Sequence, residues 1–186
     1  MRMLQAQIEP HFLFNTMSNI IAHSNQSREA ALRMIDLLVQ LVGWSISEGG
    51  QRRGTLGDEL DGIHAYLQLQ GYRIGPRLTW SNDCPVKLRA CPFPPFLIQP
   101  LVENSIRHGI EAVSGDHVIS VRVRKNARGL TIDVSDTGRG IGPGYIYGIG
   151  LSNLRERLAT HYEGRASLEF LPNHPTGVTA RLNIPL

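Results

Sequence analysis

The sequence has few cysteines and no long apolar run, and both absences narrow its class. Only Cys84 and Cys91 occur among 186 residues, and they do not form a Cys-x-x-Cys spacing. We therefore expect free thiols, with a disulfide as the less favoured alternative and no zinc site. No apolar run reaches the roughly 18 residues that a membrane-spanning helix needs, so we expect no membrane segment in this chain.

The sequence also has only a small excess of positive charge and no clear targeting signal. The formal net charge is +3 and no basic tract stands out, which argues against nucleic-acid binding and fits an acidic protein partner. The N-terminus lacks a charged-then-apolar signal segment and begins inside an amphipathic pattern. We expect a cytoplasmic piece of a longer protein, with a sensor or membrane part missing at its N-terminus. An anchor of the whole protein in the inner membrane remains open.

Two N-terminal stretches, residues 2–24 and 28–48, have the apolar spacing of amphipathic helices. The short polar link at residues 24–27 predicts that they fold back as a helical hairpin. A lone hairpin would expose its apolar stripe, so we predict a homodimer in which two hairpins form a four-helix bundle. The alternative is that the stripe packs on the C-terminal part of the same chain.

Residues 49–54 have the composition of a linker, which divides the chain into domains at 1–53 and 54–186. Thr55, followed by Asp58 and Glu59, predicts a capped helix that runs towards Arg73. Beyond it, strands are expected at 77–82, 117–124, 129–135, 165–171 and 177–184, and helices near 96–109 and 149–161. The fold class is therefore α+β, with the hairpin followed by a two-layer α/β sandwich whose sheet is mostly antiparallel.

A glycine-rich loop follows the strand that leads into Asp136. Its glycines include Gly138, Gly140, Gly148 and Gly150. Glycines let a backbone approach phosphates, and the next helix offers free N–H groups to an anion. A carboxylate at Asp136 can accept from an exocyclic amine such as that of adenine. The loop predicts a nucleotide site, with ordinary surface turns as the alternative. Arg155 and Arg157 on the following helix are expected on a solvated face rather than at phosphates.

The helix near 96–109 carries polar residues on one side. At the angular spacing of an α-helix, Glu103, Asn104, Arg107 and His108 fall within an arc of about 140°, and Ser105 falls on the apolar side. Carboxylate and amide oxygens suit Mg²⁺, and a guanidinium suits phosphate oxygens. The alternative is a solvated amphipathic face.

Along the chain, the helix near 96–109 is followed by the strand into Asp136 with its glycine-rich loop, and then by the helix near 149–161. This series of segments resembles the GHKL ATPase superfamily (gyrase, Hsp90, MutL, histidine kinases) with its Bergerat nucleotide fold, over roughly residues 78–185. The resemblance implies that ATP binds, that Asn104 holds Mg²⁺ and that Asp136 reads adenine. The remaining nucleotide-binding residues would be Arg107, His108, Gly138, Gly140, Gly148, Gly150, Leu151 and Asn153. Two positions depart from the family: Pro100 stands where many members carry a glutamate, and Val178 stands where a threonine is common.

His11 is the second chemical candidate. Gln7, His11 and Asn15 are spaced by four residues, so their side chains share one helix face. A neutral imidazole is a nucleophile at pH 7, and neighbouring amides can orient phosphate oxygens. Pro10 either kinks a longer helix or begins a separate one. By itself, a histidine on a helix is more often a surface residue.

The string of residues 4–15 resembles the phosphoacceptor box of LytS/YehU-type sensor histidine kinases, and its Pro-His-Phe-Leu-Phe-Asn is the most specific part. Further matches include Tyr66, Gln70 and Arg73, together with residues 95–109 and 148–158. The family implies that ATP phosphorylates His11 and that the phosphoryl group passes to an aspartate on the receiver domain of a response regulator.

We therefore predict a homodimeric ATP:protein-histidine phosphotransferase. Residues 1–53 would form the dimerisation and phosphotransfer hairpin, and residues 54–186 the catalytic ATP-binding domain. The catalytic residues would be His11, Asn15 and Glu103. Phe12 follows His11 where other kinase classes place an acid, so the hypothesis takes the general base from the ATP domain, with Glu103 as its candidate. The rivals are an ATP-driven clamp that forms no phosphoprotein and an inactive dimeric adaptor.

Overall fold

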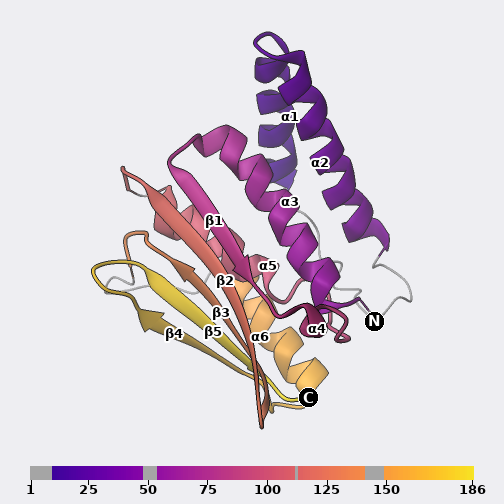
Figure 1. The fold of residues 1–186 in the computed structure, drawn as a ribbon, viewed down its shortest axis with the longest axis vertical. Helices are drawn as coiled ribbons and strands as arrows, with labels where there is room; N and C mark the ends of the chain where they lie inside the picture. Colours follow the sequence, from indigo (N-terminus) through magenta and orange to yellow (C-terminus); the bar gives the residue numbers. More distant parts are fainter. Residues whose placement is uncertain (1–9, 48–53, 112, 141–148) are drawn as a thin grey trace.

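The computed structural model describes residues 10–47, 54–111, 113–140 and 149–186 (Figure 1). For Pro10, His11, residues 44–47 and Ile149, it describes the backbone alone. Among the described residues, helices come first and a sheet with its covering helices follows, as the α+β prediction requires.

The N-terminal part is the predicted helical hairpin. It consists of α1 (Pro10–Ser24) and α2 (Arg28–Ser47), which lie side by side (Figure 1). In the turn, the Ser27 N–H donates to the His23 carbonyl (2.7 Å), and the Ser27 hydroxyl accepts from the Ala30 N–H (3.2 Å). The second bond caps the start of α2. The part of the first predicted helix that precedes Pro10 lies outside the described residues.

Helix α3 (Leu56–Ile74) packs against both the hairpin and the sheet. Its start is the predicted capping box: the Thr55 hydroxyl accepts from the Asp58 N–H (3.1 Å), and the Asp58 carboxylate accepts from the Thr55 N–H (2.9 Å). It ends at Gly75, whose φ of 82° suits glycine. Because α3 contacts both parts of the molecule, it fixes how the hairpin sits beside the sheet.

The apolar stripe of the hairpin is divided between two surroundings. Met34 and Leu41 of α2 are buried in the main core, and α2 packs along α3 (Figure 1). In contrast, Phe14, Ile21 and Val39 are 71%, 67% and 64% exposed. Packing on the same chain, which was the alternative above, accounts for part of the stripe, and a second apolar set faces solvent.

The described residues form a five-stranded sheet with the order β1-β2-β3-β5-β4. The strands are β1 (Leu78–Asp83), β2 (His117–Asn126), β3 (Gly129–Asp136), β4 (Ser167–Pro172) and β5 (Val178–Ile184). β1 is parallel to β2, and the other neighbouring pairs are antiparallel. The prediction of a mostly antiparallel sheet is confirmed.

Helices cover one face of this sheet (Figure 1). They are α3, α5 (Gln99–Asn104), the π-helical η1 (Ser105–Ile110) and α6 (Ile149–Tyr162). Alternate strand residues such as Ile119 and Val134 are buried beneath them, whereas Arg122 and Arg124 are exposed. The two-layer sandwich is confirmed. The short helix α4 (Val86–Arg89), between β1 and α5, was not predicted.

Candidate functional site

Asp136 ends β3 and is a buried hydrogen-bond acceptor. Its carboxylate accepts from the Gly138 N–H (2.9 Å), and it is also hydrogen-bonded to Ser105 and to the backbone of Val178. Burial raises the pKa of Asp136, and these hydrogen bonds and the nearby His117 oppose the rise. Such a buried acceptor fits the recognition of an exocyclic amine of a nucleobase.

Three glycines pack closely around Asp136, and at two of them, Gly138 and Gly177, a Cβ would overlap backbone atoms. A Cβ at Gly177 would lie 1.9 Å from the Asp136 carbonyl oxygen, and one at Gly138 would lie 2.4 Å from the Gly109 carbonyl carbon. A Cβ at Gly109 would lie 3.0 Å from Asp136 Oδ1. The sequence pointed to Gly138 for shaping this loop but gave no role to Gly109 or Gly177. Their packing against Asp136 was missed because the segments they join to it are far apart in sequence.

The helix that carries Asn104 changes its hydrogen-bond spacing midway. It is α-helical through Asn104 and π-helical over η1, where the Glu111 N–H donates to the Ile106 carbonyl (3.0 Å). Single π turns are frequent at functional sites. The predicted arc assumed α-helical spacing throughout, and the structure keeps this spacing only through Asn104. Ser105 is buried, as its predicted place on the apolar side requires, and it is hydrogen-bonded there to the buried Asp136.

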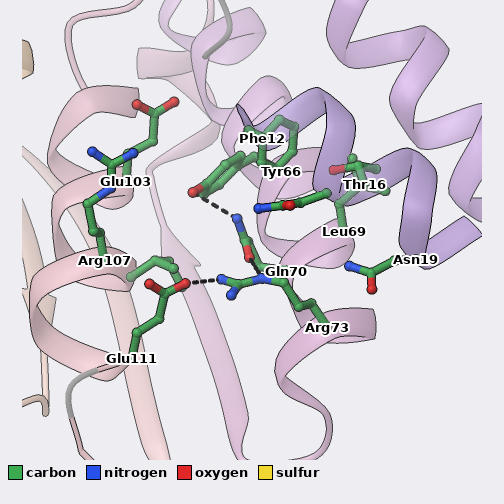
Figure 2. A pocket seen from close by; sticks show the side chains of 12 residues that line it. Phe12, Thr16, Asn19, Tyr66, Leu69, Gln70, Arg73, Glu103, Arg107 and Glu111 are labelled. Carbon is green, nitrogen blue, oxygen red and sulfur yellow. Dashed lines mark hydrogen bonds and ion pairs between the residues drawn. The ribbon is translucent and has the colours of Figure 1, made fainter. Parts of the chain in front are cut away.

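Glu103 and Arg107 lie on another side of this helix and face α1 (Figure 2). They line a cavity of about 170 Å³ with Asn15, and α3 forms its remaining wall. The Gln99 side-chain amide donates to the Glu103 carboxylate (2.8 Å) and orients it. The unit α5–η1 thus stands between Asp136 and the histidine helix, and it presents different side chains to each.

The other predicted site residues have varied surroundings. Asn104 is half-buried, whereas Gly150 and Asn153 are exposed, and Leu151 is buried at the start of α6. Gly140 has a φ of 79°. Gly148 and the His11 side chain lie outside what the structure describes.

His108 is exposed, and its pKa is lowered by partial desolvation and by the neighbouring charges of Arg107 and Arg139. A neutral ring is therefore favoured at this position.

A buried carboxylate, Glu59, holds the segment that leads into α5. It accepts from the backbone N–H groups of Phe96 (2.6 Å), Ile98 (2.8 Å) and Gln99 (3.0 Å). On the other side of this segment, the Arg157 guanidinium donates to the Phe96 carbonyl (2.9 Å) and also to Pro95. The expectation that Arg157 lies on a solvated face is wrong, because α6 packs it half-buried against these carbonyls.

The buried Glu59 predicts a pH dependence of stability. Burial raises its pKa from 4.5 to about 7, against the lowering by its three backbone hydrogen bonds and Arg157. The folded state then binds a proton more tightly than the unfolded state, so the stability from this group is lost as pH rises from about 4.5 through about 7. The loss amounts to about 3 kcal/mol at most.

Urea unfolding at pH 5 and pH 8 measures this effect. Glu59→Gln should show a smaller fall in unfolding free energy between the two pH values than the wild type. An equal fall in both proteins would mean that Glu59 does not titrate in this range.

The sheet, the α5–η1 unit and the glycine-framed Asp136 define the GHKL class of nucleotide-binding domains. The comparison with protein families agrees: residues 96–186 match the family described as "Histidine kinase-, DNA gyrase B-, and HSP90-like ATPase". Residues 1–78 match the family "Histidine kinase". The chain therefore belongs to the histidine kinase family.

Individual relatives point to the LytS type, as the sequence predicted. The chain is 32% identical to Sensor protein LytS of Staphylococcus haemolyticus, over 98% of this chain and 33% of that protein. It is 29% identical to Sensor histidine kinase YesM of Bacillus subtilis, over 100% of this chain and 33% of that protein. The chain thus spans about a third of the length of these curated relatives.

A solved structure shows the same fold. The histidine kinase domain of the Erythrobacter litoralis EL346 blue-light activated histidine kinase matches with a TM-score of 0.56 and 18% identity, over 91% of this chain and 83% of that one. Among the described helices, none is long and apolar enough to cross a bilayer.

Proposed function

We propose that this chain is the kinase core of a two-component sensor histidine kinase and transfers the γ-phosphoryl group of ATP to His11. The observation that carries the proposal is the position of α5–η1. Ser105 and Gly109 contact Asp136 on one side, while Glu103 shares a cavity with Asn15 on another. Asn15 follows His11 by one helical turn. A nucleotide at Asp136 and the acceptor helix would therefore meet across a single helical unit.

The chain's own residues can carry out the transfer. A ring nitrogen of neutral His11 attacks the γ-phosphorus, the bond to the β–γ bridging oxygen breaks, and ADP leaves with that oxygen. The other ring nitrogen releases its proton, which we assign to the Glu103 carboxylate as general base. Arg107 lines the same cavity and would neutralise charge on the phosphoryl oxygens, and Asn15 would orient one of them.

The residues around Asp136 and Asn104 fit ATP with Mg²⁺. Asp136 offers a buried acceptor to adenine, and the half-buried Asn104 offers an amide oxygen, which is a ligand type that Mg²⁺ accepts. Bound there, Mg²⁺ supplies charge neutralisation at the phosphates. The other proposed nucleotide contacts are His108, Gly138, Gly140, Gly148, Gly150, Leu151 and Asn153.

Two protein partners belong to the proposal. Phe14, Ile21 and Val39 are exposed on the hairpin, as are Met17 and Ile35, and would pack against a second copy in a four-helix bundle. The phosphoryl group would pass from His11 to the receiver domain of a response regulator. We place the dimerisation and phosphotransfer domain at residues 1–53 and the catalytic ATP-binding domain at 54–186, and we expect this core to work in the cytoplasm.

Labelling with γ-labelled ATP tests the proposal. The wild type should gain acid-labile, alkali-stable label, and His11→Gln should reduce that label by at least about 100-fold, because the acceptor nitrogen is gone. Free phosphate without labelled protein would support the ATPase clamp instead, and neither product would support the inactive adaptor.

A further inference from the structure

We propose that Tyr66, Gln70, Arg73 and Glu111 form a positioning cluster. The cluster holds α1, which carries His11, at a fixed position relative to the α5–η1 unit, so that the phosphoryl group can be transferred. The inference rests on the proposed function. The cluster acts through neighbouring side chains and does not touch the reacting atoms itself.

The cluster is a continuous series of contacts from α1 to the end of η1 (Figure 2). The Tyr66 ring lies 5.2 Å from the ring of Phe12, the first described side chain of α1. The Tyr66 hydroxyl accepts from the Gln70 amide (3.0 Å), and the Gln70 carbonyl accepts from Arg73 Nε (2.8 Å). Arg73 then forms an ion pair with Glu111, which directly follows η1. Tyr66, Gln70 and Arg73 all belong to α3, the helix that contacts α1.

The inner half of the cluster, Tyr66 and Gln70, is buried and hydrogen-bonded. Tyr66 and Gln70 are 6% and 5% exposed, and both polar ends of the Gln70 amide are used. A buried network with satisfied groups favours a single arrangement, because any rotation leaves a polar atom unpaired. Phe12, and with it the start of α1, therefore rests on a fixed surface.

The outer half of the cluster, Arg73 and Glu111, can be substituted with little loss of folding stability. The side chains of Arg73 and Glu111 are 32% and 38% exposed, and ion pairs with this degree of solvent access add little to folding stability. The pair nevertheless joins the C-terminal end of α3 to the end of η1. Loss of this ion pair should therefore change the position of α1 relative to the α5–η1 unit more than it changes the stability of the fold.

The cluster also borders the proposed catalytic group. Tyr66, Gln70, Arg73 and Glu111 line the same cavity as Glu103 (Figure 2). Burial, with a contribution from the Glu103 carboxylate, raises the pKa of Tyr66, so its hydroxyl stays neutral beside that carboxylate. Misplacement of reacting groups by about 1 Å can cost about 100-fold in rate, so a fixed register at this cavity bears directly on transfer.

Charge reversal tests the cluster. Arg73→Glu or Glu111→Arg alone should lower the initial rate of His11 labelling at saturating ATP by at least about 10-fold, with the Kd for ATP unchanged within about 2-fold. The double variant restores an opposite-charge pair and should recover the rate to within about 3-fold of wild type. Thermal unfolding of each variant shows that the protein is folded. Single variants with wild-type rates, equal losses of rate and ATP binding, or a double variant without recovery would each overturn the inference.

A distance measurement separates this inference from the proposed reaction. Nitroxide labels are attached at Ser18→Cys on α1 and Glu156→Cys on α6, which are both exposed positions. Pulsed EPR then reports the distance between the helical hairpin and the domain that contains the sheet. Cys84 and Cys91 are replaced by serine, and labelled chain is diluted with unlabelled chain. Each single reversal should broaden the distance distribution, and the double variant should narrow it again. If the variants change the distance distribution in this way but the wild type gains no label at His11, the proposed reaction fails and the cluster stands. Unchanged distributions in the single variants refute the cluster.

Discussion

Replacing Glu103 with glutamine should nearly abolish phosphorylation of His11 while ATP still binds. Glutamine has the same shape as glutamate and can keep a hydrogen bond to Gln99, but it cannot accept a proton at neutral pH. General bases contribute about 100- to 10,000-fold to rate, so we expect the initial labelling rate to fall by at least about 100-fold. The Kd for ATP should stay within about 3-fold of wild type, because Glu103 faces α1 and the contacts to Asp136 come from Ser105 and Gly109.

Two further variants sharpen this test. Glu103→Asp keeps a carboxylate with a shorter reach, so it should retain more activity than the glutamine variant. Glu156→Gln changes an exposed carboxylate on α6 in the same way and should leave the rate unchanged. If Glu103→Gln lowers ATP affinity by the same factor as the rate, Glu103 supports nucleotide binding and another group is the base.

Elements set by local patterns were predictable from the sequence. The capping box at Thr55 and Asp58 and the polar turn that ends in Ser27 each depend on residues within a few positions, and both are found. Strand positions followed from alternation of buried and exposed residues, as along β2. The division of the hairpin's apolar stripe was harder, because α2 buries Met34 against the chain's own core while Val39 on the same helix stays exposed.

The parts of the site that were missed depend on contacts between distant segments. Glu59 has the sequence appearance of an ordinary acid in the first turn of a helix, where it complements the helix dipole. Its actual partners are backbone N–H groups 37 to 40 residues further on. The π turn of η1 was also missed, because no local sequence pattern distinguishes it from an α-helix. Gln70 was named among the family matches, but its burial between Tyr66 and Arg73 was not predicted.

Gly177→Ala should remove nucleotide binding. The new Cβ would lie 1.9 Å from the Asp136 carbonyl oxygen and 2.9 Å from the Thr137 Cα, and both are backbone atoms that cannot rotate aside. The φ of Gly177 is +105°, a conformation that alanine rarely adopts. The loop after Asp136 must therefore move, and Asp136 would lose its present alignment with Ser105 and Gly138. We expect the affinity for ATP, measured by calorimetry, to fall at least about 100-fold, because a buried polar recognition group left misaligned costs several kcal/mol.

Gly43→Ala is the matched control for this substitution. Gly43 is exposed in α2, and a Cβ there meets no described atom within 4 Å. Alanine should stabilise the helix by about 0.5–1 kcal/mol and leave ATP affinity unchanged. Circular dichroism then separates loss of the site from loss of the fold. If folded Gly177→Ala binds ATP as the wild type does, the backbone at Asp136 can shift without consequence, and the close packing of glycines there is not what shapes the nucleotide site.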